Sequence, residues 1–294
     1  MDTSPSRTVS AIDFVHMNRG KSQTALVEAS DHHQYIVKWM NGARSTICVR
    51  MEAFRNSVYQ LIGLPVSSWT TIEIPEQLIE AYLEMRLMSS AGSIRPAAGI
   101  HFGSRVVCDP PGRSYESLPA NLYPRIRNRS DFWGAYALDV WTERYDDRQA
   151  VFGHCENSLD VNAVFIDHGN SVSSLESNLR SGFASCMYPD KRVYIENEMI
   201  DVIEEWIARI ARHGQSAIAA AYAQLPSDWQ TASVEALAYQ FINRIEELPE
   251  VIAALSSTQP QQISQIPGAV EVSRVPIVIL NANLTPTTEL HSNA

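Results

Sequence analysis

Apolar and polar residues alternate over short stretches in the first hundred positions, which predicts a strand-rich beginning. Three short runs with β-branched and aromatic side chains, separated by turn-forming residues, are interpreted as strands, at residues 9–15, 24–29 and 34–39. In residues 46–62 apolar side chains recur every three or four positions, which predicts a helix that ends at Gly63. Further strands are expected at 69–74 and 84–88, and the segment 75–96 is interpreted as a connector between two lobes.

Helical periodicity replaces this pattern after residue 118. Short helical turns are expected at 118–128, and Asp131 is interpreted as the cap of a helix that ends at Trp141. A long amphipathic helix is predicted at 194–213, where Gly214 is expected to end it. The remaining predicted helices lie at 215–224, 231–245 and 249–255. From residue 256 the chain is rich in Ser, Thr, Gln, Pro and Asn, which is typical of a disordered tail.

Composition and charge limit the functional classes to which this sequence can belong. With 294 residues, of which 45% are apolar, the chain can form one large domain or two lobes with a substantial core. The net charge of −10 argues against nucleic acid and anionic membranes as partners, so a nucleotide site would have to be a local basic pocket. The four cysteines are widely spaced, which argues against a zinc site. The first residues contain no apolar signal core, and no run of ~18 apolar residues follows, so we expect reduced thiols and a cytoplasmic protein.

Carboxylates gather between Trp141 and Gly169. A short cluster of acidic and basic residues, Tyr145 to Gln149, contains Asp146 and Asp147. The apolar run Ala163 to Ile166 then ends on Asp167, which predicts a buried strand that delivers a carboxylate at its end. A kinase needs one carboxylate that orients the acceptor hydroxyl and another that holds magnesium against the phosphates. The same residue types also make ordinary turns, because Asp caps turns and Gly accepts positive φ.

The strand-rich beginning carries candidate phosphate-binding residues. The turn that contains Gly20, Lys21 and Ser22 has the backbone N–H groups and polar side chains that can cradle phosphates, although a plain hairpin turn has the same composition. Lys38 lies in a predicted strand, where it is either an exposed edge residue or an ammonium that grips α- and β-phosphates. Glu52 lies mid-helix, where it is either a solvent-side residue or the partner of Lys38.

In this order, these residues resemble the HipA-like kinases, specifically a bacterial subgroup of small single-domain members. The resemblance covers about Ala11 to Gly169 and is carried by several ordered segments, which are Arg19 to Gln23, Tyr35 to Lys38, Glu52 with the following Gly63-Leu64-Pro65-Val66, His101 to Arg105, Asp139 to Thr142, Asp146 to Phe152 and Phe165 to Gly169. The helical part after residue 190 matches only loosely, and the tail does not match.

The resemblance implies an α+β, two-lobed protein-kinase-like fold that binds ATP and Mg²⁺ in its cleft. The lobes would be a small β-rich N-terminal lobe at 1–90 and a mainly helical C-terminal lobe at 91–255, followed by the polar tail at 256–294. The implied activity is transfer of the γ-phosphate of ATP to Ser or Thr of a protein. Some family members are the toxins of toxin–antitoxin pairs, so the resemblance leaves an antitoxin-like partner open, whereas the phosphorylated target and a toxin role do not transfer from these motifs.

The resemblance also implies a role for each candidate residue. Lys38 would hold phosphates, with Glu52 positioning it, and Asp167 would bind magnesium. Asp146 would be the catalytic carboxylate, with Asp147 as its only local rival. The turn that contains Gly20, Lys21 and Ser22 would cover the phosphates.

Two positions depart from the family pattern. Where these kinases usually have a metal-binding asparagine, five positions after the catalytic Asp, this chain has Val151, which cannot bind a hard cation. A position before the loop that is often Asn is Arg144, and Asn162 or His154 are the nearby residues that could replace the missing ligand. A nucleotide-binding pseudokinase therefore stays an alternative. A plain interaction domain, with Lys38, Glu52 and the aspartates scattered in space, is a third.

Overall fold

The structure, a computed structural model, describes residues 8–18, 23–40, 46–89, 92–107, 114–144, 146–154, 158, 160–169 and 186–250. Residues 1–256 form one compact unit, and 257–294 form a second unit that lies outside the described residues. The predicted disordered tail and the predicted phosphate-binding turn at Gly20, Lys21 and Ser22 therefore lie outside the described residues.

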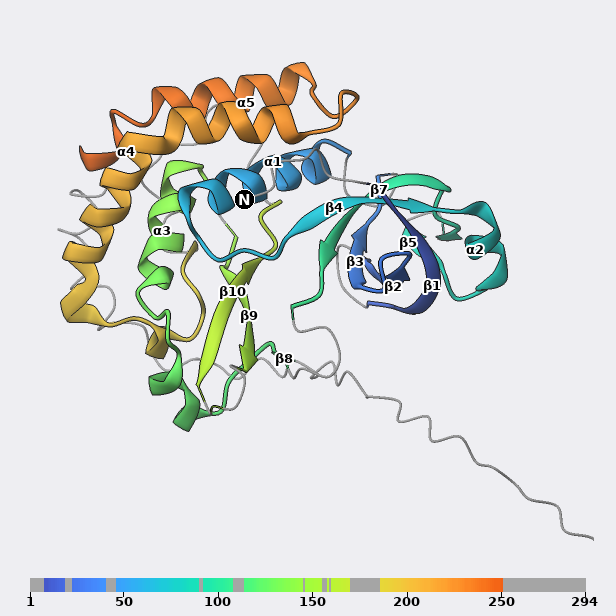
Figure 1. Ribbon diagram of the computed structural model, residues 1–294, viewed down its shortest axis with the longest axis horizontal. Coiled ribbons are helices and arrows are strands. Elements are labelled where there is room, and N and C mark those ends of the chain that lie inside the picture. The colour runs from blue at the N-terminus through green and yellow to red at the C-terminus, as the bar shows by residue number, and fades with distance from the viewer. Residues whose placement is uncertain are drawn as a thin grey trace, which may run out of the picture. The chain divides into compact units, whose positions relative to one another are not determined.

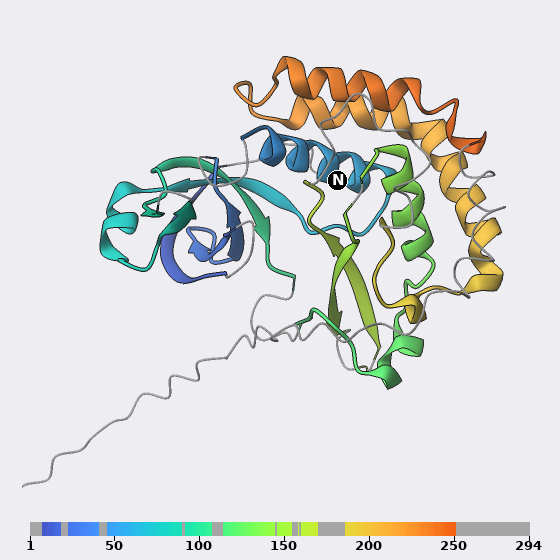
Figure 2. The same cartoon turned by 180° about the vertical axis from the view of Figure 1, so that it is seen from behind.

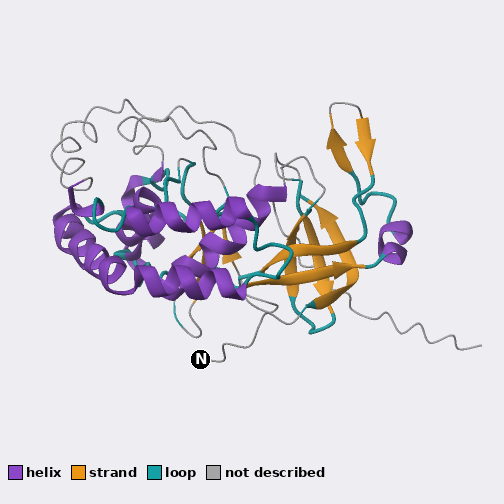
Figure 3. Cartoon of the chain, turned by 90° about the horizontal axis from the view of Figure 1, so that it is seen from above, coloured by secondary structure: helices purple, strands orange, loops and turns teal. Residues whose placement is uncertain are grey.

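Five strands form a closed barrel in the order β1-β2-β3-β7-β4 (Figures 1 and 3). The strands are β1 (Val9–Met17), β2 (Ala25–Ala29), β3 (Gln34–Lys38), β4 (Trp69–Ile74) and β7 (Gly99–Arg105). Neighbours are antiparallel except β1 and β4, which run parallel. Apolar residues such as Val27, Val37 and Ile72 are buried in one core cluster of the barrel. Burial alternates in β3, whereas β2 and β4 bury adjacent residues as well.

The structure differs from the predicted connector between lobes at 75–96, because the chain returns to the barrel afterwards as β7. That segment leaves the barrel after β4, forms α2 (Glu76–Ala81) and a hairpin of β5 (Leu87–Ser89) and β6 (Gly92–Ile94), and then leads back into the barrel. β7 pairs with both β3 and β4, although its sequence shows no clear alternation. A Cβ at Gly103 would lie 2.3 Å from the Ile72 side chain, so a glycine is required where these strands meet.

Helix α1 (Thr46–Ile62) forms where the periodicity predicted it. Gly63 ends it with a φ of 107°, a conformation that only glycine adopts without strain. Within the apolar stripe Phe54, Val58 and Ile62 are buried. Ile47 and Met51 are partly buried, and Leu61 is exposed. Polar residues of α1 are also buried, among them Glu52 and Arg55.

A second sheet pairs β8 (Ser114–Tyr115), β9 (Gln149–His154) and β10 (Val161–Ile166), and β10 contains the predicted apolar strand. The turn η1 (Ala120–Arg125) and helix α3 (Asp131–Trp141) lie between β8 and β9 in the sequence. Asp131 does not cap α3, because Ser130 is the cap residue and the Asp131 carboxylate instead accepts a hydrogen bond from Asn128 Nδ2 at 3.0 Å.

The predicted break at Gly214 is wrong, because α4 (Met199–Gln224) runs through it as one helix (Figure 2). A Cβ at Gly214 would lie 3.0 Å from the Ile245 side chain and 3.3 Å from that of Trp141. The glycine therefore lets neighbouring segments approach α4. Two short turns, η3 (Lys191–Val193) and η4 (Glu196–Glu198), precede α4, and α5 (Ala232–Asn243) follows it. α4 packs against α1, α3 and α5.

The described helices include none that combines the length and the apolar character of a membrane span.

Candidate functional site

Lys38 is the last residue of β3, and its ammonium joins three elements. Nζ lies 2.5 and 2.7 Å from the two carboxylate oxygens of Glu52 on α1. It also lies 2.8 Å from Oδ1 of Asp167, directly after β10. The Lys38 side chain is only 10% exposed and that of Glu52 4%, so neither is the exposed residue that the simpler interpretation expects. The chain brings residues 38, 52 and 167 together, which excludes the scattered arrangement of a plain interaction domain.

Charge at Lys38 is favoured although the side chain is buried. Burial alone lowers the pKa of Lys38, but the carboxylates of Glu52 and Asp167 raise that pKa by more, so it lies above its usual value. The ammonium therefore stays charged, held between the carboxylates of Glu52 and Asp167.

Asp167 adopts a left-handed backbone conformation, with a φ of 55°, immediately after β10. Asp accepts this conformation more readily than most residues. Its Oδ2 accepts a hydrogen bond from Gln149 Nε2 at 3.0 Å, across the β9–β10 hairpin. Two residues later, a Cβ at Gly169 would lie 2.6 Å from Oε2 of Glu52, so any larger residue at this position would have to displace the Glu52 carboxylate.

Asp146 and Asp147 lie in a short loop between α3 and β9, which we call the acidic loop (Asp146 to Arg148). Asp146 is half-buried and Asp147 exposed. The backbone N–H of Asp147 donates to Oδ1 of Asp146 at 3.1 Å, which is ordinary turn chemistry. The loop therefore shows the turn chemistry that its residue types allow, and the catalytic role of its carboxylates stays a prediction.

Arg144 connects the acidic loop to the Asp167 turn (Asp167 to Gly169). Its guanidinium donates to the carbonyl oxygens of Asp146 at 2.5 Å and Asp147 at 3.0 Å. The same group donates to the carbonyl oxygen of Asp167 at 2.9 and 3.2 Å. Sequence reasoning treated Arg144 only as a departure from a family pattern, whereas the structure gives it a fully buried position beneath both carboxylate-bearing segments.

A buried polar network that sequence reasoning missed supports these segments. Asp139 on α3 accepts hydrogen bonds from Tyr59 and, at both carboxylate oxygens, from the guanidinium of Arg148. Arg148 also lies 3.1 Å from Nδ1 of His168, whose pKa is well below its usual value because burial and the nearby arginines disfavour the imidazolium. Arg55 donates to the carbonyl oxygens of His168 and Thr142. The sequence did offer one signal for this network, because Arg55 and Asp139 are charged residues within the apolar positions of α1 and α3.

The residues proposed as replacements for Val151 lie elsewhere. Val151 pairs with Val164 across the hairpin, so both positions are aliphatic. Asn162 lies five residues before Asp167, which is roughly 16 Å along a strand. His154 pairs with Val161, at the same far end of the hairpin, where its ring packs on Tyr115. Neither residue can replace a ligand beside Asp167, so that suggestion is wrong.

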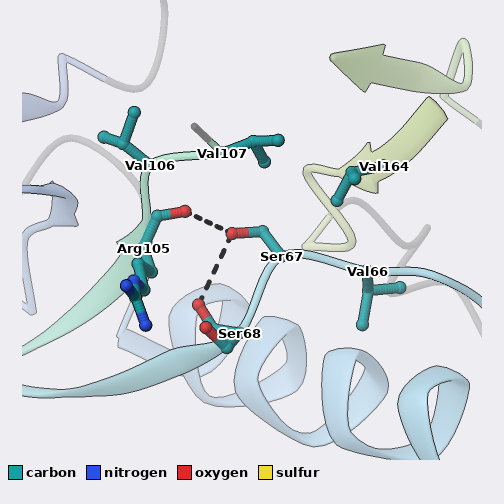
Figure 4. A pocket seen from close by; sticks show the side chains of 7 residues that line it. All are labelled: Val66, Ser67, Ser68, Arg105, Val106, Val107 and Val164. Carbon is teal, nitrogen blue, oxygen red and sulfur yellow. Dashed lines mark hydrogen bonds between the residues drawn. The ribbon is translucent and has the colours of Figure 1, made fainter. Parts of the chain in front are cut away.

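Valine side chains and polar residues together line a pocket beside β10. It has a volume of about 280 Å³ and is formed by residues 66–68, 105–107 and Val164 (Figure 4). The Ser67 hydroxyl hydrogen-bonds the carbonyl oxygen of Arg105 at 2.5 Å. Val66 bridges to Phe165, which places the pocket wall directly against the strand that ends at Asp167.

Among the described residues, no three His, Cys, Asp or Glu side chains gather in a way that could hold a metal ion. Asp167 is a carboxylate of the kind that hard cations prefer. An ion at Asp167 would therefore take its other ligands from water and from phosphate oxygens, as magnesium commonly does.

Comparisons with known proteins concern the fold. No protein-family model matches the chain, and no curated protein sequence matches it. Among solved structures, the proinflammatory kinase CtkA of Helicobacter pylori has a TM-score of 0.50 at 12% identity, covering 83% of this chain and 95% of its own. The Golgi casein kinase has a TM-score of 0.49 at 11% identity, covering 87% of this chain and 74% of its own.

A third similar structure is HipA of Shewanella oneidensis, in a toxin–antitoxin complex with HipB and operator DNA. Its TM-score is 0.45 at 13% identity, and the match covers 85% of this chain and 68% of HipA. The likeness to CtkA concerns the fold alone, because the sequences are so different. The chain therefore has a kinase-like fold, with a strand-rich first part and helices later.

Proposed function

We propose that this chain is a HipA-like, ATP-dependent kinase that transfers the γ-phosphate to a Ser or Thr hydroxyl of another protein. The observation that carries the proposal is the contact of Lys38 with both Glu52 and Asp167, at 2.5 and 2.8 Å. A strand lysine paired with a helix glutamate, beside a strand-end aspartate, is the arrangement with which protein kinases hold phosphates and magnesium.

Each residue has a role in the proposal. Lys38 provides the fixed positive charge for the phosphates, and Glu52 keeps that ammonium in place. Asp167 would hold Mg²⁺, which when bound neutralises charge on the transferred group. Asp146 would accept the proton of the acceptor hydroxyl, with Asp147 as the neighbouring alternative. Gly20, Lys21 and Ser22 would cover the phosphates.

The base of ATP is proposed to occupy the pocket beside β10. Val164, which lines the pocket, lies three residues before Asp167, roughly 10 Å along the strand. That separation suits a nucleotide whose base and phosphates bind at opposite ends of the site. The small lobe would then be the barrel, and its boundary would follow Arg105 rather than residue 90. The cytoplasmic location and the antitoxin-like partner belong to the same proposal.

Calorimetric titration of ATP, with and without Mg²⁺, tests the site. We expect binding that strengthens with magnesium in the wild-type protein and loses that dependence in Asp167→Asn. The matched control is Asp160→Asn, which removes a carboxylate at the opposite end of β10, where it pairs with Arg127 at 3.1 Å. Equal magnesium dependence in all three proteins would contradict the role of Asp167.

Transfer of radiolabelled phosphate to protein tests the reaction. We expect transfer that Asp146→Ala abolishes and Asp147→Ala reduces less. Labelling that neither variant reduces would contradict the assignment of the acidic loop.

A second candidate function is nucleotide binding without transfer. The aliphatic pair of Val151 and Val164 favours it, because a second metal ligand is missing from that position. Magnesium-dependent ATP binding without detectable transfer to any protein would support this candidate over the kinase.

A further inference from the structure

Three buried arginines hold the two carboxylate-bearing segments through their backbones. Arg55, Arg144 and Arg148 are each at most 1% exposed. Together they donate to six carbonyl oxygens, those of Thr142, Asp146, Asp147, Ile166, Asp167 and His168. All six belong to the end of α3, the acidic loop or the end of β10 with the turn that follows.

The arginines outnumber the buried carboxylates that pair with them. Asp139 is fully buried and forms ion pairs with Arg148 and, at 3.7 Å, with Arg144. Burial of a charge is unfavourable unless hydrogen bonds satisfy it. The carbonyl oxygens therefore compensate the guanidinium groups, which ties the geometry of both segments to the arginine side chains.

Arg144 alone among the three donates to the carbonyl oxygens of all three candidate aspartates. One atom, Nη2, lies 3.0 Å from the Asp147 oxygen and 2.9 Å from the Asp167 oxygen. The acidic loop and the Asp167 turn thus share a donor, and neither can shift without lengthening a bond to it. The planar fork of arginine makes this possible, whereas a lysine presents its donors from a single atom.

We propose that Arg144 is a positioning residue that holds the acidic loop and the Asp167 turn in one fixed geometry. It would thereby align the carboxylate that accepts a proton with the carboxylate that holds the metal ion. This role in alignment rests on the function proposed above, but the joint restraint of the two segments does not.

Hydrogen exchange of the full chain measures the restraint directly. In Arg144→Lys the positive charge stays but the span of the fork is lost. We expect exchange to become about tenfold faster, or more, at both 146–150 and 166–169, because each lost hydrogen bond to a charged donor changes an equilibrium by at least that factor. The control is Tyr59→Phe, which removes hydrogen bonds to Asp139 and Thr142 in the same network but leaves the three aspartate carbonyls untouched.

Two results would overturn the proposal. One is an exchange rate in Arg144→Lys that is unchanged, or that rises in only one of the two segments, 146–150 and 166–169. The other is an equal rise in both segments in Tyr59→Phe, which would reflect general loosening of the core. If Arg144→Lys does not fold, Arg144→Gln, which keeps a planar donor group, replaces it under the same criteria.

Kinetics then separate alignment from binding. We expect the kcat of Arg144→Lys to fall about tenfold and KM for ATP to change by a smaller factor, because Lys38 and Glu52 keep their own hydrogen bonds when the Asp167 turn loosens. A fall in kcat/KM through KM alone would contradict alignment. A wild-type protein that binds no ATP would refute the proposed function, and the exchange comparison would still decide whether Arg144 joins the two segments.

Discussion

Replacement of Gly169 by alanine tests whether the Asp167 turn and the Lys38–Glu52 pair are packed as the structure describes. The added Cβ would lie 2.6 Å from Oε2, 3.2 Å from Cβ and 3.3 Å from Cδ of Glu52. The φ of Gly169 is not in the positive range, so alanine adds no backbone strain. Any effect therefore comes from the contact with Glu52.

The expected magnitude follows from these distances. Ordinary contact requires about 3.4 Å, so the carboxylate oxygen must move by roughly 0.8 Å. Glu52 accepts the hydrogen bonds of Lys38 at 2.5 and 2.7 Å. Such a shift takes them to the limit of hydrogen bonding, at about 3.2 Å or beyond. Overpacking of this kind lowers the free energy of unfolding by about 1–3 kcal/mol.

Urea unfolding of four proteins measures this coupling. They are the wild type, Gly169→Ala, Glu52→Ala and the double variant. Since Glu52→Ala removes the two outer atoms that the new methyl group meets, Gly169→Ala should cost at least about 1 kcal/mol less in that background. An equal cost in both backgrounds would refute the reasoning, because the destabilisation would then arise away from Glu52.

Three further predictions concern stability. The pKa of Lys38 is raised in the folded protein, so the charged side chain stabilises the fold below its ordinary pKa of about 10.5, and this stabilisation is lost as pH rises through the folded value. In urea unfolding, the difference in the free energy of unfolding between wild type and Lys38→Met should therefore shrink above that pH, and a constant difference would contradict this. Asp139→Asn should lower the free energy of unfolding by about 3–5 kcal/mol in the same assay, since it leaves the Arg148 guanidinium buried without its ion pair, and a change below about 1 kcal/mol would count against the network. Gly134→Ala should lower the melting temperature, because its Cβ would lie 2.1 Å from the Trp206 ring, and an unchanged midpoint would contradict the close contact of α3 with α4.

Local patterns were enough for the elements whose residues are close in sequence. The apolar runs at β1 to β4 and the helical periodicity of α1 and α3 can be recognised from each segment's own residues. Strand β7 was not recognised, because its neighbours β3 and β4 lie far before it in the sequence. Gly214 misled the prediction for the same reason, since its role is set by Trp141 and Ile245. Strand β9 was missed although it pairs with β10, the next strand along the chain.

For the candidate site, the sequence alone determined which residue types were present and in which order, namely a strand lysine, a helix glutamate and a strand-end aspartate. Only the tertiary structure decided that they meet, because hydrogen bonds between residues 38 and 167 depend on how the barrel and β10 are placed. It also decided the role of Arg144. A buried charge needs partners to compensate its desolvation, and those partners are backbone carbonyls up to 23 residues away, which carry no signature in the sequence.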